Sequence, residues 1–231
     1  LVVSVASERS TAQAPQGGVT ALTGVRIIDG TGRAPIEQGT ILIGNGRITA
    51  AGAASSVQIP AGAARVDLAG KTVIPGMINA HAHVQNQTKG MPMRDDLVRR
   101  LRMYASYGIT TAVSLGQVTN DETVEVLKLR DEQDRGALDR ARVYTSGPSI
   151  RGLKTVDEVR QTVDRYADQK VDRIKTHVTP QMTPEQYAAL IDEAHKRGLR
   201  ANAHIFYLKE AEMVLERGVD VIAHSVRDVN V

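Results

Sequence analysis

The apolar and polar positions of this chain follow two different patterns, one on each side of Lys71. Between Val19 and Lys71, short apolar runs alternate with glycine-containing turns, as in TALTGVRIIDG and GTILIGNGRITAAG. Asn45-Gly46 lies between ILIG and RITA, and this dipeptide is a strong signal for a two-residue hairpin turn. The pattern predicts a small all-β domain over residues 19–71.

After Lys71, β runs alternate with amphipathic stretches. The β runs begin near Val73, Gly108, Arg142, Val171, Leu199 and Val219. Between them lie stretches such as DDLVRRLRMYASY and TPEQYAALIDEAHKRG, whose apolar residues recur every three or four positions. Repeated strand, helix and strand units of this length predict parallel pairing, in a barrel or in an open sheet.

Local signals mark the ends of several predicted helices. Thr183 is expected to be an N-cap, followed by Pro184 in the first helical position and Gln186 in a capping box. Gly198 and Gly218 follow the last turns of two helices, where C-cap glycines are common.

Composition and charge exclude several classes of function. The 231 residues carry a net charge of +3, and the 29 basic residues are interleaved with 26 acidic ones. No basic stripe forms, so nucleic acid is not an expected partner. No apolar run approaches the roughly eighteen residues of a membrane span, so no membrane contact is expected. Cysteine is absent, which leaves His, Asp, Glu and Lys as candidates for chemistry.

The first 18 residues form a predicted leader. Leu1 to Ala6 read LVVSVA, which is typical of the end of a signal-peptide apolar region, and Ala12-Gln13-Ala14 has the form of a cleavage site. A remnant of a signal peptide would indicate an exported, periplasmic protein. A plain disordered leader is the alternative, and a cytoplasmic location would then be expected.

Four of the six histidines fall in or just past the C-terminal half of a predicted β run: His81, His83, His204 and His224. In parallel β/α barrels, that end of the strands carries the active site. His81 and His83 are two residues apart, so on a strand both face the same side and can chelate one ion. Such a pair alone is weak evidence, and the two further histidines at equivalent strand ends strengthen it.

Lys175 lies within the fourth β run, between Ile174 and Thr176. A lysine on a barrel strand points into the core or toward the site, and a buried lone ammonium group is costly. Such a lysine is usually paired, depressed in pKa or chemically modified. Carbon dioxide converts a neutral amine to a carbamate, whose oxygens can bridge two metals. The alternative is an ion pair near the barrel rim.

The stretch VIPGMINAHAHV resembles the first-strand motif of the amidohydrolase superfamily. From Val171 to Asp228, the spacing of DRIKTHV, LRANAHIF and VDVIAHSV resembles the imidazolonepropionase and prolidase-like branch. The preceding β domain is similar to the N-terminal part of the small β-sandwich that these enzymes carry. The resemblance covers about residues 19–231. It implies a (β/α)8 (TIM) barrel, of which residues 72–231 supply about six strands.

The resemblance also implies a ligand set for two divalent ions, most simply zinc. The first ion is expected on His81 and His83, the second on His204 and His224, and carboxylated Lys175 bridges them. Lys175 and His224 are the expected catalytic residues.

Three further residues have expected roles outside this ligand set. Asn79 stands where many relatives have aspartate and is expected to support the ligands from outside. A surface or packing role is favoured for His177 over contact with substrate or metal. His195, in DEAHKRG, is expected on the outer layer.

The resemblance implies hydrolysis of a C–N bond in a small amide, dipeptide or lactam, through attack by a metal-bound hydroxide. Relatives place a metal-binding aspartate after strand eight, whereas this chain stops at Val231. We therefore expect a fragment that is inactive alone and that self-associates, as a homo-oligomer, through its open edge strands. Two alternatives remain: a truncated metal-binding or scaffold protein without activity, and a mononuclear heterocycle deaminase, which lacks the bridging lysine.

Overall fold

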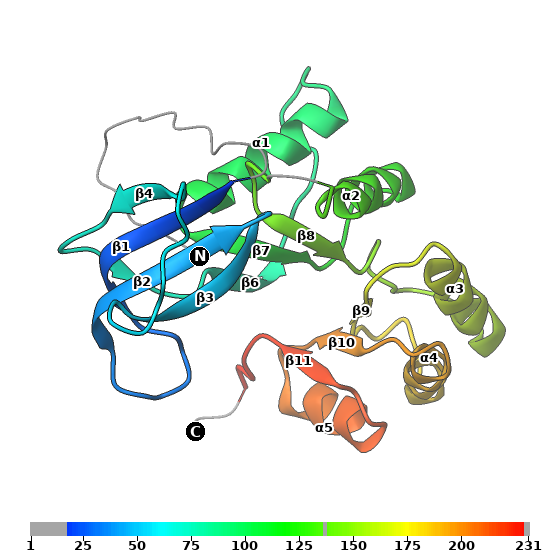
Figure 1. Cartoon of the computed structure of the whole chain (residues 1–231). Helices are drawn as coiled ribbons and strands as arrows, with labels where there is room; N and C mark the ends of the chain where they lie inside the picture. The colour runs from blue at the N-terminus through cyan, green and yellow to red at the C-terminus, as the bar shows by residue number, and fades with distance from the viewer. Residues whose placement is uncertain (1–17, 136–137, 229–231) are drawn as a thin grey trace.

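The computed structural model describes residues 18–135 and 138–228. Within these ranges the chain has a mixed α/β fold, with a five-stranded sheet, two three-stranded parallel sheets and five helices (Figure 1). Residues 1–17 of the predicted leader, including its apolar run and its candidate cleavage site, lie outside the described residues.

The five-stranded sheet is built from the N-terminal β runs. Its strands are β1 (Val19–Ile27), β2 (Ile36–Gly44), β3 (Arg47–Ala53), β4 (Ala64–Asp67) and β5 (Thr72–Val73). The order is β3-β2-β1-β4, with β5 also paired to β1. The hairpin at Asn45-Gly46 is confirmed, since both residues adopt positive φ angles, 51° and 72°, between antiparallel β2 and β3. Val25, Ile41 and Val73 belong to the buried apolar cluster of this sheet.

The six β runs after Lys71 form two parallel sheets. The first contains β6 (Met77–Ala82), β7 (Ile109–Ser114) and β8 (Arg142–Thr145); the second contains β9 (Ile174–His177), β10 (Ala201–His204) and β11 (Val221–Ala223). The orders are β6-β7-β8 and β11-β10-β9, and every neighbouring pair is parallel. The predicted parallel pairing is therefore confirmed, whereas closure into an eight-stranded barrel stays a prediction.

The two parallel sheets meet through a loop residue. Ile150 forms an isolated parallel bridge with Thr176, and its N–H donates to the carbonyl oxygen of Lys175 at 2.8 Å. Gly147 has a φ of 68°, and Pro148 has no N–H to donate, so β8 cannot continue as a regular ladder beside β9. The ladder is thus interrupted, although the strands remain side by side.

Each parallel strand except β11 is followed by a helix in the described residues. The helices are α1 (Met93–Ser106), α2 (Asn120–Glu132), α3 (Val156–Asp168), α4 (Pro184–Lys196) and α5 (Leu208–Glu216). They lie in an arc outside the parallel strands (Figure 1). The capping box of Thr183 and Gln186 is confirmed, and so are the left-handed glycines Gly198 and Gly218.

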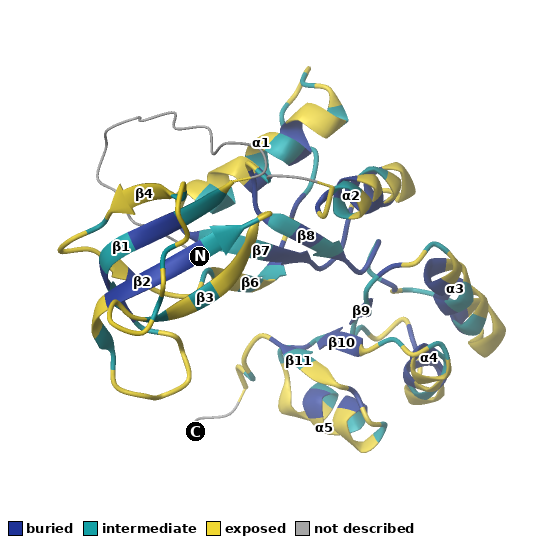
Figure 2. Ribbon diagram, in the orientation of Figure 1, coloured by how far each residue is buried: buried dark blue, intermediate teal, exposed yellow. Residues whose placement is uncertain are grey.

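Burial is greatest where the helices cover the strands (Figure 2). One apolar cluster joins α1 and α2 to β7 and β8, and a second joins α3, α4 and α5 to β9 and β10. The edge strands β6 and β11 are more exposed, with Ile78 at 67% and Val221 at 36% exposure. In the described ranges, no helix has the length and apolar character that crossing a membrane requires.

Candidate active site

The predicted site residues come together at the carboxyl ends of the parallel strands. His81 lies in β6 and His83 directly follows it, Lys175 lies in β9, His204 ends β10, and His224 follows β11. The ring centroids of His81 and His83 are 5.3 Å apart, those of His81 and His224 4.8 Å, and those of His204 and His224 4.4 Å. The four histidines come from β6, β10 and β11 and lie up to 143 positions apart in the sequence, and they share one cluster.

His177 belongs to the same cluster. Its ring centroid lies 4.2 Å from that of His204, and its Nδ1 is hydrogen-bonded to Ser149 Oγ at 2.5 Å. The sequence pattern favours a surface or packing role for His177 and does not predict this position. His177 reaches the cluster because β9 and β10 are in register and His177 is paired directly with His204. We refer to His81, His83, His177, His204 and His224 as the histidine cluster.

The rings of the histidine cluster do not converge on one point. In the part of the chain that the structure describes, no three His, Asp or Glu side chains have the arrangement of a complete metal site. Adjacent rings are tilted against one another by 31° to 73°. What the structure provides is a group of closely spaced imidazoles at the predicted place.

The histidine cluster is neutral at pH 7. Burial is the main cause that lowers the pKa of His81, His177 and His204 to about 4. The ammonium group of Lys175 adds to this effect for His81 and His177, and the neighbouring His177 ring does so for His204. The pKa values of His83 and His224 are lowered too, by burial and then by Lys175. Neutral imidazole has a nitrogen lone pair available for a metal ion.

Lys175 is buried beside the histidine cluster. Its side chain is 1% exposed, its Nζ atom has no hydrogen-bond partner among the described residues, and burial lowers its pKa to about 8. The alternative of an ion pair at the rim finds no support, because no carboxylate in the described residues pairs with Lys175. A buried polar group without a partner requires an explanation, such as a ligand or a modification.

Asn202 is a second buried polar residue without partners, and sequence reasoning missed it. It is 1% exposed, neither atom of its amide group is hydrogen-bonded, and its backbone is paired in register with Lys175. It also precedes His204 by two residues, so both side chains face the same side of β10. That spacing, in an otherwise small and apolar run ANAH, was the available signal.

His224 has an unusual backbone conformation. Its φ of 78° lies in the left-handed region, which side chains other than glycine rarely adopt. Such strain persists where surrounding structure enforces it, and it is concentrated at functional sites. The conformation turns the chain after β11 so that the His224 ring lies between those of His81 and His204.

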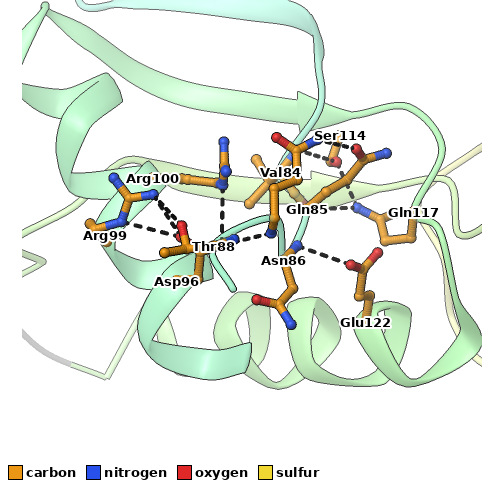
Figure 3. Close-up of polar contacts among 11 residues, drawn as sticks. Val84, Gln85, Asn86, Thr88, Asp96, Arg99, Arg100, Ser114, Gln117 and Glu122 are labelled. Carbon is orange, nitrogen blue, oxygen red and sulfur yellow. Dashed lines mark hydrogen bonds and ion pairs between the residues drawn. The ribbon is translucent and has the colours of Figure 1, made fainter. Parts of the chain in front are cut away.

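The loop after β6 is held by two buried carboxylates (Figure 3). Asp96 of α1 accepts hydrogen bonds from the backbone N–H groups of Gln87 and Thr88 and from Arg99, while Glu122 of α2 accepts from the N–H of Asn86 at 2.9 Å. These bonds hold the pKa of Asp96 well below its ordinary value. The carboxylates fix the segment that follows His83.

Gln117 links the segment after β6 to β7 (Figure 3) and to β8. Its Nε2 donates to Ser114 Oγ at 2.6 Å and to the carbonyl oxygen of Val84 at 3.2 Å, and its Oε1 accepts from the hydroxyl of Thr145. The amide is therefore fully engaged, in contrast to that of Asn202.

Two remaining expectations concern Asn79 and His195. Asn79 Oδ1 accepts from the backbone N–H of His81 at 3.1 Å, so it braces a proposed ligand from outside. His195 lies on α4 with its Nε2 atom 2.8 Å from Asp220 Oδ2, on the outer layer as expected.

A small cavity opens beside the histidine cluster. Its volume is about 240 Å³, and its wall includes His83, His177, Ser149 and Arg151 together with Leu115 and Pro148. Ser149 and Arg151 were not identified from the sequence.

Histidines and an unpartnered lysine at the carboxyl ends of parallel strands are the arrangement expected of a candidate active site in an α/β enzyme. Residues 72–228 match the model of the amidohydrolase family. The chain therefore belongs to the amidohydrolase family, as its first-strand motif indicates.

Known proteins share both sequence and fold with this chain. A 5-methylthioadenosine/S-adenosylhomocysteine deaminase from Symbiobacterium thermophilum is 27% identical over 214 residues, which are 80% of this chain and 48% of the deaminase. A candidate prolidase from Bifidobacterium longum superposes with a TM-score of 0.77 at 30% identity, over 90% of this chain and 54% of that protein. A Xaa-Pro dipeptidase with bound methionine superposes with a TM-score of 0.75 at 21% identity, over 90% of this chain and 62% of the dipeptidase.

The chain spans about half the length of the curated deaminase that it matches. The shared fold supports the arrangement of parallel strands and outer helices described above. Activity and substrate require a separate argument from the site.

Proposed function

We propose that this chain carries the metal site of a hydrolase that cleaves a C–N bond in a small amide, dipeptide or lactam. The observation that carries the proposal is Lys175, a buried amine with no hydrogen-bond partner that lies beside five neutral imidazoles. Membership of the amidohydrolase family supports hydrolysis, and the likeness to the candidate prolidase supports a peptide-like substrate.

The residue types of the site are those that bind divalent metal ions. Imidazole nitrogens and carboxylate-type oxygens are ligands that zinc prefers, and a chain without cysteine offers no thiolate alternative. His81 and His83 would hold one ion, and His204 and His224 the other. Lys175, as a carbamate, would add oxygen ligands to this set.

Carboxylation of Lys175 requires a neutral amine. With a pKa of about 8, roughly a tenth of Lys175 is neutral at pH 7. The amine nitrogen forms a bond to the carbon of carbon dioxide and releases one proton, which leaves a carbamate with one negative charge. Asn202, whose amide has no other partner, lies in register beside Lys175 and can donate a hydrogen bond to such a group.

When bound, the metal ions supply Lewis acidity, which polarises a carbonyl group and lowers the pKa of water. The chain's own residues orient the substrate. Ser149 engages Nδ1 of His177, so Nε2 is the ring nitrogen that remains for a substrate oxygen. The carboxylates of Asp96 and Glu122 fix the loop that follows His83.

Deamination of a heterocyclic amine is the second candidate function. The 27% identity to a 5-methylthioadenosine/S-adenosylhomocysteine deaminase favours it. A mononuclear deaminase site has no use for a bridging lysine, and the position of Lys175 therefore favours hydrolysis of an amide with two ions.

Substrate assays test the proposal. The chain is assayed with Zn²⁺ on Xaa-Pro dipeptides, lactams and 5-methylthioadenosine, both alone and co-expressed with any coding sequence that continues past Val231. We expect amide hydrolysis in the co-expressed sample, reduced on the order of a hundredfold in His204→Ala. Deamination alone would establish the second candidate. Metal binding without turnover in either sample would contradict the proposal and support a non-catalytic role.

A further inference from the structure

The cavity beside the histidine cluster contains a charge that the proposed reaction does not use. Arg151 lies in the loop after β8 and forms part of the cavity wall with His83 and His177. No carboxylate of the described ranges forms an ion pair with Arg151, in contrast to Arg130, which pairs with Asp172.

We propose that Arg151 binds a carboxylate of the substrate, so that the favoured substrates are small N-acyl amino acids or dipeptides with a free carboxyl group. This inference rests on the proposed hydrolysis of an amide. It names the substrate class and the residue that selects it. A guanidinium group matches a carboxylate through two parallel hydrogen bonds, which neutral analogues cannot reproduce.

The composition of the cavity wall supports an anionic, partly apolar ligand. Arg151 is its one permanently charged residue in the described chain, and no aspartate or glutamate lines it. Leu115 and Pro148 add an apolar surface that suits a short aliphatic side chain. The volume of about 240 Å³ lies below the usual range for drug-sized ligands, roughly 300–1,000 Å³. The cavity therefore suits one amino-acid unit.

The arrangement of residues along the cavity wall would orient the scissile amide bond of the substrate. His83 and His177 belong to the histidine cluster, and Arg151 follows Ser149, the hydrogen-bond partner of His177, by two residues. A carboxylate on Arg151 would direct the neighbouring amide of the same amino-acid unit toward the imidazoles. Arg151 therefore acts as a specificity residue.

Binding of a matched pair of probes tests the inference. N-acetyl-L-valine and its neutral amide, N-acetyl-L-valinamide, are titrated into the full chain with Zn²⁺ and followed by calorimetry. We expect the acid to bind about tenfold more tightly than the amide, as one charge-assisted pair at a partly exposed site allows. Arg151→Gln should abolish this preference and leave binding of the amide unchanged, and Arg151→Lys should restore it in part.

The control is Lys154→Gln, which removes an equal charge from an exposed position three residues away that does not line the cavity. Lys154→Gln should retain the preference. Equal losses in the two variants, no preference in the wild type, or no binding of either probe would each overturn the inference. Failure of hydrolysis with Arg151-dependent binding intact would instead refute only the proposed function. Hydrolysis without discrimination between the probes would refute only this inference.

Discussion

The carboxyl ends of the two parallel sheets differ in how their buried polar groups are bonded. Beside β6, β7 and β8, the carboxylates of Asp96 and Glu122 and the amide of Gln117 are at most 4% exposed, and all are hydrogen-bonded. Beside β9 and β10, Lys175 and Asn202 are each 1% exposed, and their side-chain polar atoms have no partner.

A buried polar group without a hydrogen-bond partner destabilises a fold by about 1–3 kcal/mol, whereas a buried polar group that is hydrogen-bonded does not have this cost. The buried polar residues beside the first sheet therefore stabilise a loop through their hydrogen bonds. The second retains groups that cost stability, which is expected where a ligand or a modification completes them. Substitutions at equivalent depths in the two sheets should accordingly have opposite effects on stability.

The largest effect is expected for Asp96→Ala. This change leaves the N–H groups of Gln87 and Thr88 without acceptors and removes the partner of Arg99. We expect the free energy of unfolding to fall by about 3 kcal/mol. Urea denaturation measures it, and Asp95→Ala is the matched control, because Asp95 is exposed on the same helix. A loss no larger than in the control would refute the anchoring role of Asp96.

The effect of Asp96 should depend on pH in a defined direction. Its pKa in the folded chain is lowered from the ordinary value of 3.8, because the carboxylate accepts several hydrogen bonds. Its stabilising contribution is therefore complete above about pH 4 and decreases as the pH falls further. The wild type and Asp96→Ala should differ most near pH 7 and converge in acid. A constant difference down to pH 2 would show that charge is not the cause.

Lys175→Met should change stability in the opposite direction. Methionine fills a similar volume without a buried amine, so we expect a gain of about 2 kcal/mol in the metal-free chain. The folded pKa of Lys175 is about 8, below its ordinary 10.5, so the penalty of burying the ammonium group is complete below pH 8. The gain should shrink as the pH rises from 8 to 10.5.

Urea denaturation across this pH range measures the effect of Lys175→Met. Lys154→Met at an exposed position serves as the control, with an expected change within about 0.5 kcal/mol. Destabilisation by Lys175→Met would mean that the amine has a partner in solution and that the contrast between the two sheets is false.

Two buried amides provide the smallest and most closely matched comparison. Asn202→Leu removes an amide without partners and should raise the free energy of unfolding by about 1 kcal/mol, whereas Gln117→Leu removes a bonded amide and should lower it by a similar amount. Thermal denaturation of both variants decides the point. If the free energy of unfolding changed in the same direction in both variants, the contrast between the two buried amides would be wrong.

Sequence patterns predict those parts of this fold that depend on neighbouring residues. The six β runs after Lys71, the helices between them and the caps at Thr183 and Gly198 follow from periodicity and local turn chemistry. The positions of His204 and His224 at strand ends follow from the same pattern, because parallel strands bring their carboxyl ends together.

Contacts between distant segments were not predictable in this way. Nothing local connects Glu122 to the N–H of Asn86, 36 residues earlier, or Gln117 to the hydroxyl of Thr145. The place of His177 in the histidine cluster depends on the register between β9 and β10, and a one-residue shift would move its side chain to the other face. Arg151 lines the cavity after the turn at Gly147 and Pro148.

The most direct test is the number of metal ions that the chain binds with and without Lys175. Wild-type chain and Lys175→Met, each co-expressed with any coding sequence that continues past Val231, are equilibrated with Zn²⁺ and bicarbonate, freed of excess metal and analysed for zinc per chain. We expect two ions in the wild type and at most one in Lys175→Met, because the variant lacks the carbamate between the ions. Equal zinc content in the two proteins, or a single ion beside an unmodified Lys175, would contradict the proposed role of this lysine.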